Sequence, residues 1–312
     1  MPTLTESVIR DQFPYWQAAM RQDMPLLSAG TVVVTGCGTS YYLAQSLACV
    51  CNAHGQRAIA VPGAEWARRP DSYLADPRDI LVLGLSRSGT TTETVQAMQT
   101  SSTRGWPSFA LSCVEGAEII LAADRGLYVP TDPREGIVMS VSASLMLLAG
   151  LRLMGIAVPG EVITTARQAL ADMALGAAAV IRGRHHFVYL GAGANYGLAT
   201  EGCLKLQEMS ITYSQSFHPM EYRHGPISLI DDASVVVMLY TPDTATEEAV
   251  LVAELQAKGA RVIGFGGPGD LTINASGLAC LPALQMLGEL VALQKGINSE
   301  SPRHLTKVVV LA

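Results

Sequence analysis

Charge is scarce in this chain. Asp, Glu, Lys and Arg make up 15% of its 312 residues and aromatic residues only 6%, whereas hydrophobic residues make up 49%. Most of the chain must therefore be buried, and its length suffices for two α/β domains. The net charge of −6 argues against a nucleic-acid partner. A small anionic ligand stays possible, because backbone N–H groups alone can hold a phosphate.

Long apolar runs are also missing. No apolar run reaches the ~18 uncharged residues of a membrane span, and the longest candidate, around Ser144–Gly150, is far too short. The N-terminus has neither the basic start nor the apolar core of a secretory signal. We expect a cytoplasmic protein with no membrane partner.

Motifs for metals and nucleotides are absent too. None of the Cys and His residues has the spacing of zinc ligands, so the cysteines are expected to be free thiols and no metal site is expected. After the first predicted strand, Gly36–Tyr41 fails the last position of G-x-G-x-x-G, and the chain contains no G-x-x-x-x-G-K-[ST]. We therefore expect no nucleotide or other cofactor. The cysteines are Cys37, Cys49, Cys51, Cys113, Cys203 and Cys280.

Short β-branched runs alternate with longer amphipathic stretches, which is typical of parallel sheets with crossover helices. The predicted strands are Thr31–Thr35, Ile80–Leu85, Ser108–Ser112, Gly126–Val129, Phe187–Leu190, Ser234–Leu239 and Arg261–Phe265.

The order of these features repeats. The segment Thr35–Ser40, a strand end followed by a glycine turn, is echoed at Leu190–Asn195, and Leu85–Glu93 is echoed at Leu239–Glu247. Two landmarks at nearly equal offsets indicate two copies of one α/β unit. We predict a leading helix over residues 1–25, a first domain over 26–160 and a second over 161–312.

Two loops of the first copy follow strand ends, where open α/β sheets bind ligands. One contains Gly38, Thr39 and Ser40, and the other runs from Ser86 to Thr91. Their hydroxyls and N–H groups, with Arg87, are suited to a phosphate. The alternative is that Ser and Thr merely cap helices. The second copy has Tyr240–Asp243 at the matching place and is not expected to bind phosphate.

Glu201, Lys205 and Glu208 share one face of a predicted helix after the second glycine turn. A carboxylate beside an ammonium in a cleft can serve as an acid–base pair. A solvated salt-bridged stripe would show the same spacing. Downstream, His224 lies in a turn before Gly225-Pro226, where a histidine is commonly only a surface residue.

Together these segments resemble the sugar isomerase (SIS) family, in particular the isomerase half of glucosamine-6-phosphate synthases. The resemblance runs from about residue 25 onward and implies two tandem SIS domains, each a parallel sheet flanked by helices in a flavodoxin-like three-layer α/β fold. It is carried by Cys37–Tyr41, Ser86–Thr91, Glu201–Glu208, His224–Pro226 and Lys295–Lys307.

The resemblance also implies roles for single residues. The positions that hold the sugar phosphate correspond to Ser40, Ser86, Ser88 and Thr91, and Arg87 replaces a glutamine of the family. Ser140 matches a contact to sugar hydroxyls. The implied catalytic residues are Glu208 for proton transfer, Lys307 for a Schiff base, His224 for ring opening, and Glu201 and Lys205 as acid–base support. In the family the histidine comes from the neighbouring subunit, which implies a homodimer.

The synthases carry a glutamine-hydrolysing domain that this sequence does not show. We therefore expect deamination of an amino-sugar phosphate such as glucosamine 6-phosphate, giving fructose 6-phosphate and ammonia. A ketosamine-phosphate deglycase and a simple aldose–ketose isomerase remain alternatives. So does a non-catalytic sugar-phosphate sensor, although a sensor needs neither the acid–base residues nor the tail lysine.

Overall fold

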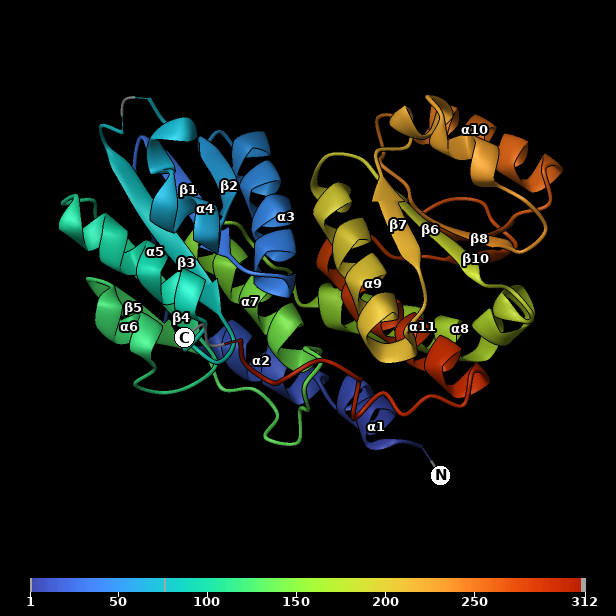
Figure 1. Cartoon of the computed structure of the whole chain (residues 1–312), viewed down its shortest axis with the longest axis horizontal. Helices are drawn as coiled ribbons and strands as arrows, with labels where there is room; N and C mark the ends of the chain where they lie inside the picture. The colour runs from blue at the N-terminus through green and yellow to red at the C-terminus, as the bar shows by residue number, and fades with distance from the viewer. Residues whose placement is uncertain (1, 76, 310–312) are drawn as a thin grey trace. The chain divides into compact units, whose positions relative to one another are not determined.

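The β-branched runs of the sequence form two five-stranded parallel sheets, as the computed structural model of the chain shows (Figure 1). The structure describes residues 2–75 and 77–309. It divides into two units. The first unit is Gln12–Pro159 with the tail from Thr306, and the second is Gly160–Leu305 with the segment before Gln12.

In the first unit the strands pair in the order β2-β1-β3-β4-β5. All pairs are parallel, and the central strands β1 and β3 are buried along their whole length. Burial on both faces explains why these strands read as continuous apolar runs. The strands are β1 (Thr31–Gly36), β2 (Ala58–Pro62), β3 (Ile80–Ser86), β4 (Ser108–Ser112) and β5 (Arg125–Tyr128).

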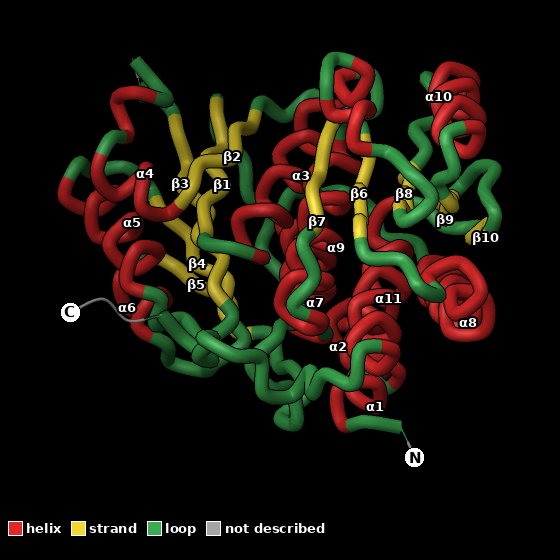
Figure 2. Tube along the Cα trace, turned by 45° about the vertical axis from the view of Figure 1, so that its right-hand side comes forward, coloured by secondary structure: helices red, strands yellow, loops and turns green. Residues whose placement is uncertain are grey.

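Helices cover both faces of this sheet (Figure 2). Helices α4, α5 and α6 pack in a row, and α7 packs between α2 and α3. The bounds are α2 (Phe13–Arg21), α3 (Thr39–Ala53), α4 (Gly63–Arg68), η1 (Pro70–Ser72), α5 (Thr92–Thr103), α6 (Glu118–Ala122) and α7 (Val141–Leu153).

The second unit has the sheet order β10-β9-β8-β6-β7, again with every pair parallel. When β6 is aligned with β1, both sheets follow the flavodoxin-like order 2-1-3-4-5. The expected fold, two tandem three-layer α/β domains, is confirmed. The strands are β6 (His186–Gly191), β7 (Ser214–Phe217), β8 (Ser234–Leu239), β9 (Arg261–Phe265) and β10 (Leu271–Ile273).

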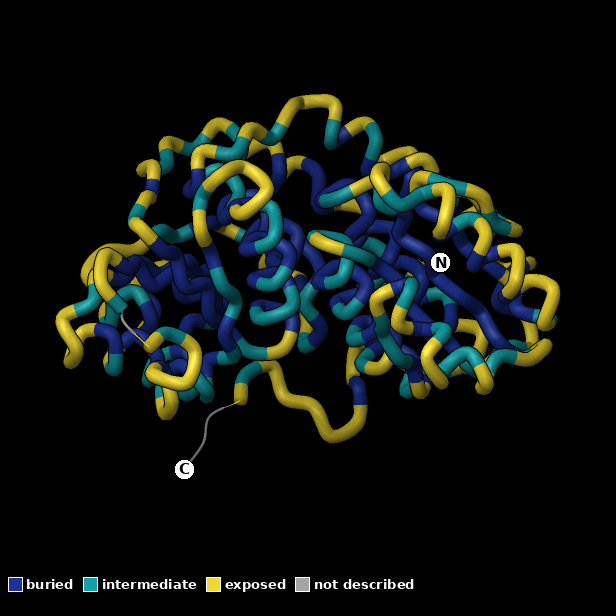
Figure 3. The backbone as a smooth tube through the Cα atoms, turned by 90° about the horizontal axis from the view of Figure 1, so that it is seen from above, coloured by how far each residue is buried: buried dark blue, intermediate teal, exposed yellow. Residues whose placement is uncertain are grey.

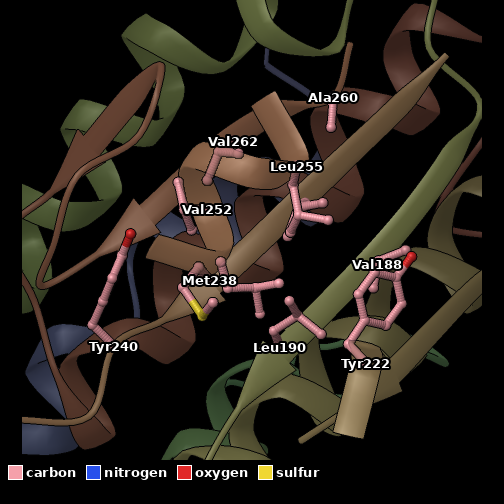
Figure 4. Packing of buried hydrophobic residues seen from close by; sticks show 11 residues of the cluster. Val188, Leu190, Tyr222, Met238, Tyr240, Val252, Leu255, Ala260 and Val262 are labelled. Atoms are coloured by element: carbon pink, nitrogen blue, oxygen red, sulfur yellow. The ribbon is translucent and has the colours of Figure 1, made fainter. Parts of the chain in front are cut away.

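In this unit α8, α9 and α11 pack together, and α1 packs on α11. Helix α10 lies over β8 and β9, where Val252 and Leu255 meet Met238 and Val262 in a buried cluster (Figure 4). The bounds are α1 (Leu4–Arg10), α8 (Glu161–Ile181), α9 (Ala194–Ser210), η2 (Glu221–Arg223), η3 (Pro226–Leu229), α10 (Ala245–Ala257), η4 (Gly277–Cys280) and α11 (Leu281–Gln294).

The two copies share backbone detail as well as topology. Gly38 has φ 53° and ψ −126°, and Gly193, at the predicted offset, has φ 54° and ψ −127°. Only glycine adopts this conformation without strain. Each glycine directly precedes the first residue of a long helix, α3 or α9. The glycine turn therefore starts the first crossover helix in both copies.

Two sequence-based expectations need correction. The single leading helix is two helices, α1 and α2, because Pro14 is tolerated only in the first turn of a helix and a new helix starts there. The apolar stretch around Ser144–Gly150 is also not the longest one. The helical segment Gly277–Gln294 is long and apolar enough to cross a membrane, but 78% of it is buried. It packs against α8 and α9 as a core helix.

The buried segments lie in the interior of each unit, and the exposed residues lie at its outer turns (Figure 3). The loops after β1 and β3 depart from adjacent strands in the same direction, because these strands pair in parallel. They therefore leave the sheet at one edge, as do the loops after β6 and β8 in the second unit.

Candidate functional site

The hydroxyl-rich loop of the first unit follows β3 and precedes α5. The Ser86 Oγ accepts a hydrogen bond from the Gly89 N–H at 3.1 Å, and the Ser88 Oγ accepts one from the Thr90 N–H at 3.3 Å. These bonds tighten the turn but leave each serine with its own O–H proton to donate. Shaping the loop and binding an anion are therefore compatible.

Helices α3 and α5 both begin at this edge of the sheet. Helix α3 follows Gly38, which has no side chain to cap it, and Thr91 at the N-cap position of α5 makes no side-chain capping hydrogen bond. The capping interpretation thus fails for Thr91. Two helix N-termini with positive dipole ends favour a negative ligand here.

A small cavity of about 60 Å³ lies between these loops. This is roughly twice the ~30 Å³ that one water occupies in the liquid, so it suits a compact group rather than a whole sugar. Five predicted phosphate residues and Lys307 line it, whereas Gly38 and Thr39 shape the turn and are not among the lining residues. The lining is Cys37, Ser40, Leu85, Ser86, Arg87, Ser88, Thr91, Thr94, Met139 and Lys307.

Sequence reasoning did not assign Cys37 to this cavity. Its thiol lies 3.5 Å from the Thr94 hydroxyl. Burial raises the pKa of Cys37, and the hydrogen bond from Thr94 opposes this only in part. The thiol is therefore mainly protonated near neutral pH and acts as a wall of the cavity rather than as a nucleophile.

Arg87 lines the cavity with a nearly buried side chain, 9% exposed. Its guanidinium donates to three main-chain carbonyls, those of Gly136 at 3.1 Å, Ile137 at 2.9 Å and Lys307 at 2.8 Å. The Lys307 ammonium in turn donates to the Glu135 carbonyl at 2.9 Å. The tail thus contacts Arg87 through its main chain and the segment 135–137 through its side chain.

Ser140, the expected contact to sugar hydroxyls, is buried at the N-cap of α7 and does not line the cavity. The Glu135 carboxylate accepts from its N–H at 2.7 Å, from its hydroxyl at 3.2 Å, and from the Ser142 N–H at 3.0 Å. Glu135 was missed by sequence reasoning. A buried acid in a chain poor in charge, just before a helix of apolar residues, was the available signal.

In the second unit the predicted acid–base residues lie together on α9. The Lys205 ammonium is 2.5 Å from the Glu208 carboxylate and 3.5 Å from that of Glu201. Glu201 and Lys205 are fully buried, and only Glu208 keeps part of its side chain exposed, 21%. A solvated stripe is therefore excluded. The arrangement is a buried ammonium between two carboxylates, one of which reaches an accessible surface.

Glu208 opens onto a pocket of about 350 Å³ within this unit. Arg303 and His304 of the tail bring two nitrogen-bearing side chains to the same pocket. His304 has φ 67°, which is uncommon for any residue but glycine. The pocket is lined by Leu204, Gln207, Glu208, Ile211, Arg303, His304 and Leu305.

His224 follows η2 and is exposed. It is not among the residues that line the pocket of Glu208. A different histidine of this unit, His218, stacks on Tyr196 with ring centroids 4.0 Å apart.

The matching loop of the second copy already holds a carboxylate. Glu248, fully buried in the first turn of α10, accepts from the Thr241 N–H at 2.8 Å and from the Thr244 hydroxyl at 3.0 Å. The donors that would meet a phosphate here are thus used by the chain's own anion. Within the described residues, His, Cys, Asp and Glu form no group of three that could hold a metal ion.

Comparison with known proteins supplies a family. A model described as the SIS domain matches residues 25–154 and 180–275. The isomerizing glutamine–fructose-6-phosphate aminotransferase of Pyrobaculum aerophilum is 28% identical over 92% of this chain and 52% of its own length. The corresponding aminotransferase of Halobacterium salinarum is 28% identical over 92% of this chain and 53% of its own length. The chain thus spans about half the length of these curated relatives.

Solved structures give matches over the whole chain. A glucosamine-6-phosphate deaminase from Thermotoga maritima aligns with a TM-score of 0.88 at 27% identity, covering 99% of this chain and 100% of that one. A tagatose-6-phosphate ketose/aldose isomerase from Escherichia coli aligns with a TM-score of 0.80 at 22% identity, covering 99% and 96%. The second likeness concerns the fold alone.

Proposed function

The chain belongs to the SIS domain family, and from this premise we propose that it is an amino-sugar-phosphate deaminase and isomerase. The proposed reaction converts glucosamine 6-phosphate, or a close relative, to fructose 6-phosphate and ammonia. Its relatives and structural neighbours act on sugar phosphates by isomerase chemistry, which supports an enzyme of the phosphosugar isomerase family.

The observation that carries the choice of reaction is the match to the Thermotoga deaminase. That protein is 27% identical to this chain over 99% of its length, with a TM-score of 0.88. The match supports deamination of an amino-sugar phosphate.

In this proposal the first unit binds the phosphate. Ser40, Ser86, Ser88 and Thr91 donate hydroxyl protons, and the starts of α3 and α5 add favourable dipoles. The Lys307 ammonium lines the same cavity and adds a positive charge.

Glu208 moves the proton. In the open-chain aldose it removes the hydrogen at C2 and returns a proton to C1, which converts the C1 aldehyde and C2 amine into a C1 alcohol and a C2 imine. A single carboxylate serves both carbons because they are adjacent. Lys205 and Glu201 hold Glu208 in place from within α9.

Lys307 then completes the release of ammonia. Its amine adds to the C2 imine and expels ammonia, forming a Schiff base between C2 and the lysine nitrogen. Water hydrolyses that Schiff base to the ketose and the free lysine. For this step the amine must first leave the Glu135 carbonyl to which it donates in the structure.

We also propose that His224 opens the sugar ring and is lent by a second copy of the chain in a homodimer. Its exposure on the second unit is compatible with that role. Mixed dimers of two inactive variants, His224→Ala and Glu208→Gln, are then expected to regain activity at one site. Failure of every mixture to regain activity would refute a shared site.

The main experiment incubates the purified chain with glucosamine 6-phosphate and measures ammonia and fructose 6-phosphate. We expect Glu208→Gln to lower kcat by about 10² to 10⁴, as for a lost general base. Lys307→Ala should lower it as well. Ser86→Ala combined with Ser88→Ala should raise KM, whereas Ser102→Ala, an exposed serine on α5, should not.

The outcomes separate the alternatives. Fructose 6-phosphate interconverting with an aldose phosphate, without ammonia, would identify a simple isomerase. Release of ammonia or another amine only from a ketosamine phosphate would identify a deglycase. Tight binding of several sugar phosphates with no turnover would refute the enzyme and favour a sensor.

A further inference from the structure

Arg87 stands in the middle of the phosphate-binding loop, yet its side chain contacts protein carbonyls. Its Nη2 group donates to both Ile137 and Lys307, and its Nη1 group donates to Gly136. The two Nη2 protons are thus fully used. The side chain therefore binds the main-chain carbonyls of two other segments rather than a ligand.

We propose that Arg87 is a positioning residue that latches the C-terminal tail onto the phosphate-binding loop. Arg87 donates a hydrogen bond to the main-chain carbonyl of Lys307, and this contact keeps the Lys307 amine at the cavity. The part of this inference that concerns catalysis rests on the proposed function, because it assigns Lys307 a chemical role. The latch itself does not.

The residue type fits this task. A guanidinium has five N–H donors in a planar fork and can bind three carbonyls at once. A glutamine at this position has two N–H donors and no charge, and a lysine has a point-like ammonium on a flexible stem. Glu135, whose carboxylate lies 3.9 Å from Nη1 and is buried, balances the charge that Arg87 brings into the interior.

Arg87 also couples three segments through one residue. Its own carbonyl accepts from the Cys113 N–H at 3.1 Å and from the Ser112 hydroxyl at 3.3 Å, which fixes its main chain to the end of β4. Its neighbours Ser86 and Ser88 line the cavity. A shift of the phosphate-binding loop must therefore change the hold on Lys307, and release of the tail must loosen that loop.

Limited trypsin digestion tests the latch without any assay of turnover. The bond Lys307–Val308 is a trypsin site, and its carbonyl is the one that Arg87 holds. Cleavage at this bond should be about tenfold faster or more in Arg87→Gln, since a hydrogen bond to a charged group is lost. Mass spectrometry of the shortened chain measures the rate.

Two variants make the digestion interpretable. Arg87→Lys keeps the charge but not the fork, and cleavage should fall between wild type and Arg87→Gln. Arg104→Gln removes an exposed arginine of the same unit, which contacts Asp71 and the Trp106 ring at the surface, and should leave the rate unchanged. If Arg87→Gln does not fold, Arg87→Lys decides alone. Wild-type cleavage rates in the folded Arg87 variants would overturn the latch.

Ligand binding separates a latch from a phosphate ligand. If Arg87 is a latch, the affinity of Arg87→Gln for inorganic phosphate, measured by calorimetry, stays within about twofold of that of wild type. The same substitution then lowers kcat more than it raises KM. A tenfold loss of phosphate affinity with unchanged cleavage would make Arg87 a phosphate ligand and refute the proposal. If no sugar phosphate is turned over by wild type, the proposed function fails and the digestion still decides the latch.

Discussion

Replacing Lys205 by methionine tests whether the charged residues of α9 are a buried network. The ammonium lies between two carboxylates, its side chain is 1% exposed and that of Glu201 is 0% exposed. Methionine has a similar shape and no charge, so Glu201 is left as a buried anion without its cation. Removing one partner of a buried ion pair costs about 3–5 kcal/mol.

The size of this effect is measurable by thermal unfolding. A domain of this size shifts its Tm by about 2–4 °C per kcal/mol, so Lys205→Met should lower the Tm by about 6–20 °C. The matched control is Arg69→Met, which breaks an ion pair of the same i,i+4 spacing, Glu65–Arg69, with side chains 34% and 59% exposed. It should cost at most about 0.5 kcal/mol.

A double variant distinguishes charge from packing. Glu201→Gln removes the stranded anion, so the pair Glu201→Gln plus Lys205→Met should be more stable than Lys205→Met alone. A Lys205→Met protein that melts within a degree or two of wild type would refute the buried network and return these residues to a solvated stripe.

Two further predictions concern the small cavity of the first unit and the loops around it. Gly89 has φ +68°, and a Cβ there would lie 2.2 Å from the Ala117 Cβ, whereas Gly105, with φ +69°, has open space. Gly89→Ala should therefore lower the Tm clearly more than Gly105→Ala and weaken inorganic phosphate binding in calorimetry; equal effects of the two variants would contradict the close contact. Cys37, whose pKa burial raises, should react slowly with iodoacetamide at pH 7.5, faster as the pH rises past 9, and more slowly when inorganic phosphate is present. Cys49, whose pKa burial also raises but which does not line the cavity, is the control, and its labelling should ignore phosphate; a Cys37 that phosphate does not protect would place the ligand elsewhere.

The interior strands of both sheets could be predicted from the sequence, whereas three of the four edge strands could not. All seven predicted strands are present, with ends that move by no more than about a residue. The missed strands β2, β7 and β10 are edge strands. An edge strand is buried less and has no need of a continuous apolar run, so β7, with the sequence Ser-Gln-Ser-Phe, carries no pattern that separates it from a loop.

The residues of the candidate site could likewise be predicted only in part. Hydroxyls after two adjacent strand ends can be found from sequence, because strand order and chain direction bring such loops together. The burial of Glu201 and Lys205 could not be predicted, since the spacing i, i+4, i+7 is the same for a buried and a solvated helix face. Burial here depends on α11, where Gly288 allows close approach: a Cβ at that position would lie 3.1 Å from the Lys205 carbonyl.

The two copies show how one fold supports different roles. In both, a glycine turn starts the first crossover helix, and a second loop follows the third strand. At the predicted offset of 154 residues, Glu248 corresponds to Thr94, which lines the cavity of the first copy. In the first copy the loop donors face an open cavity, and in the second they bind the Glu248 carboxylate. The buried Glu248 carboxylate accepts from the Thr241 N–H and the Thr244 hydroxyl of this loop. These donors are therefore not available to an anionic ligand. In the proposed function the first unit therefore binds the phosphate, and α9 of the second unit supplies the acid–base residues.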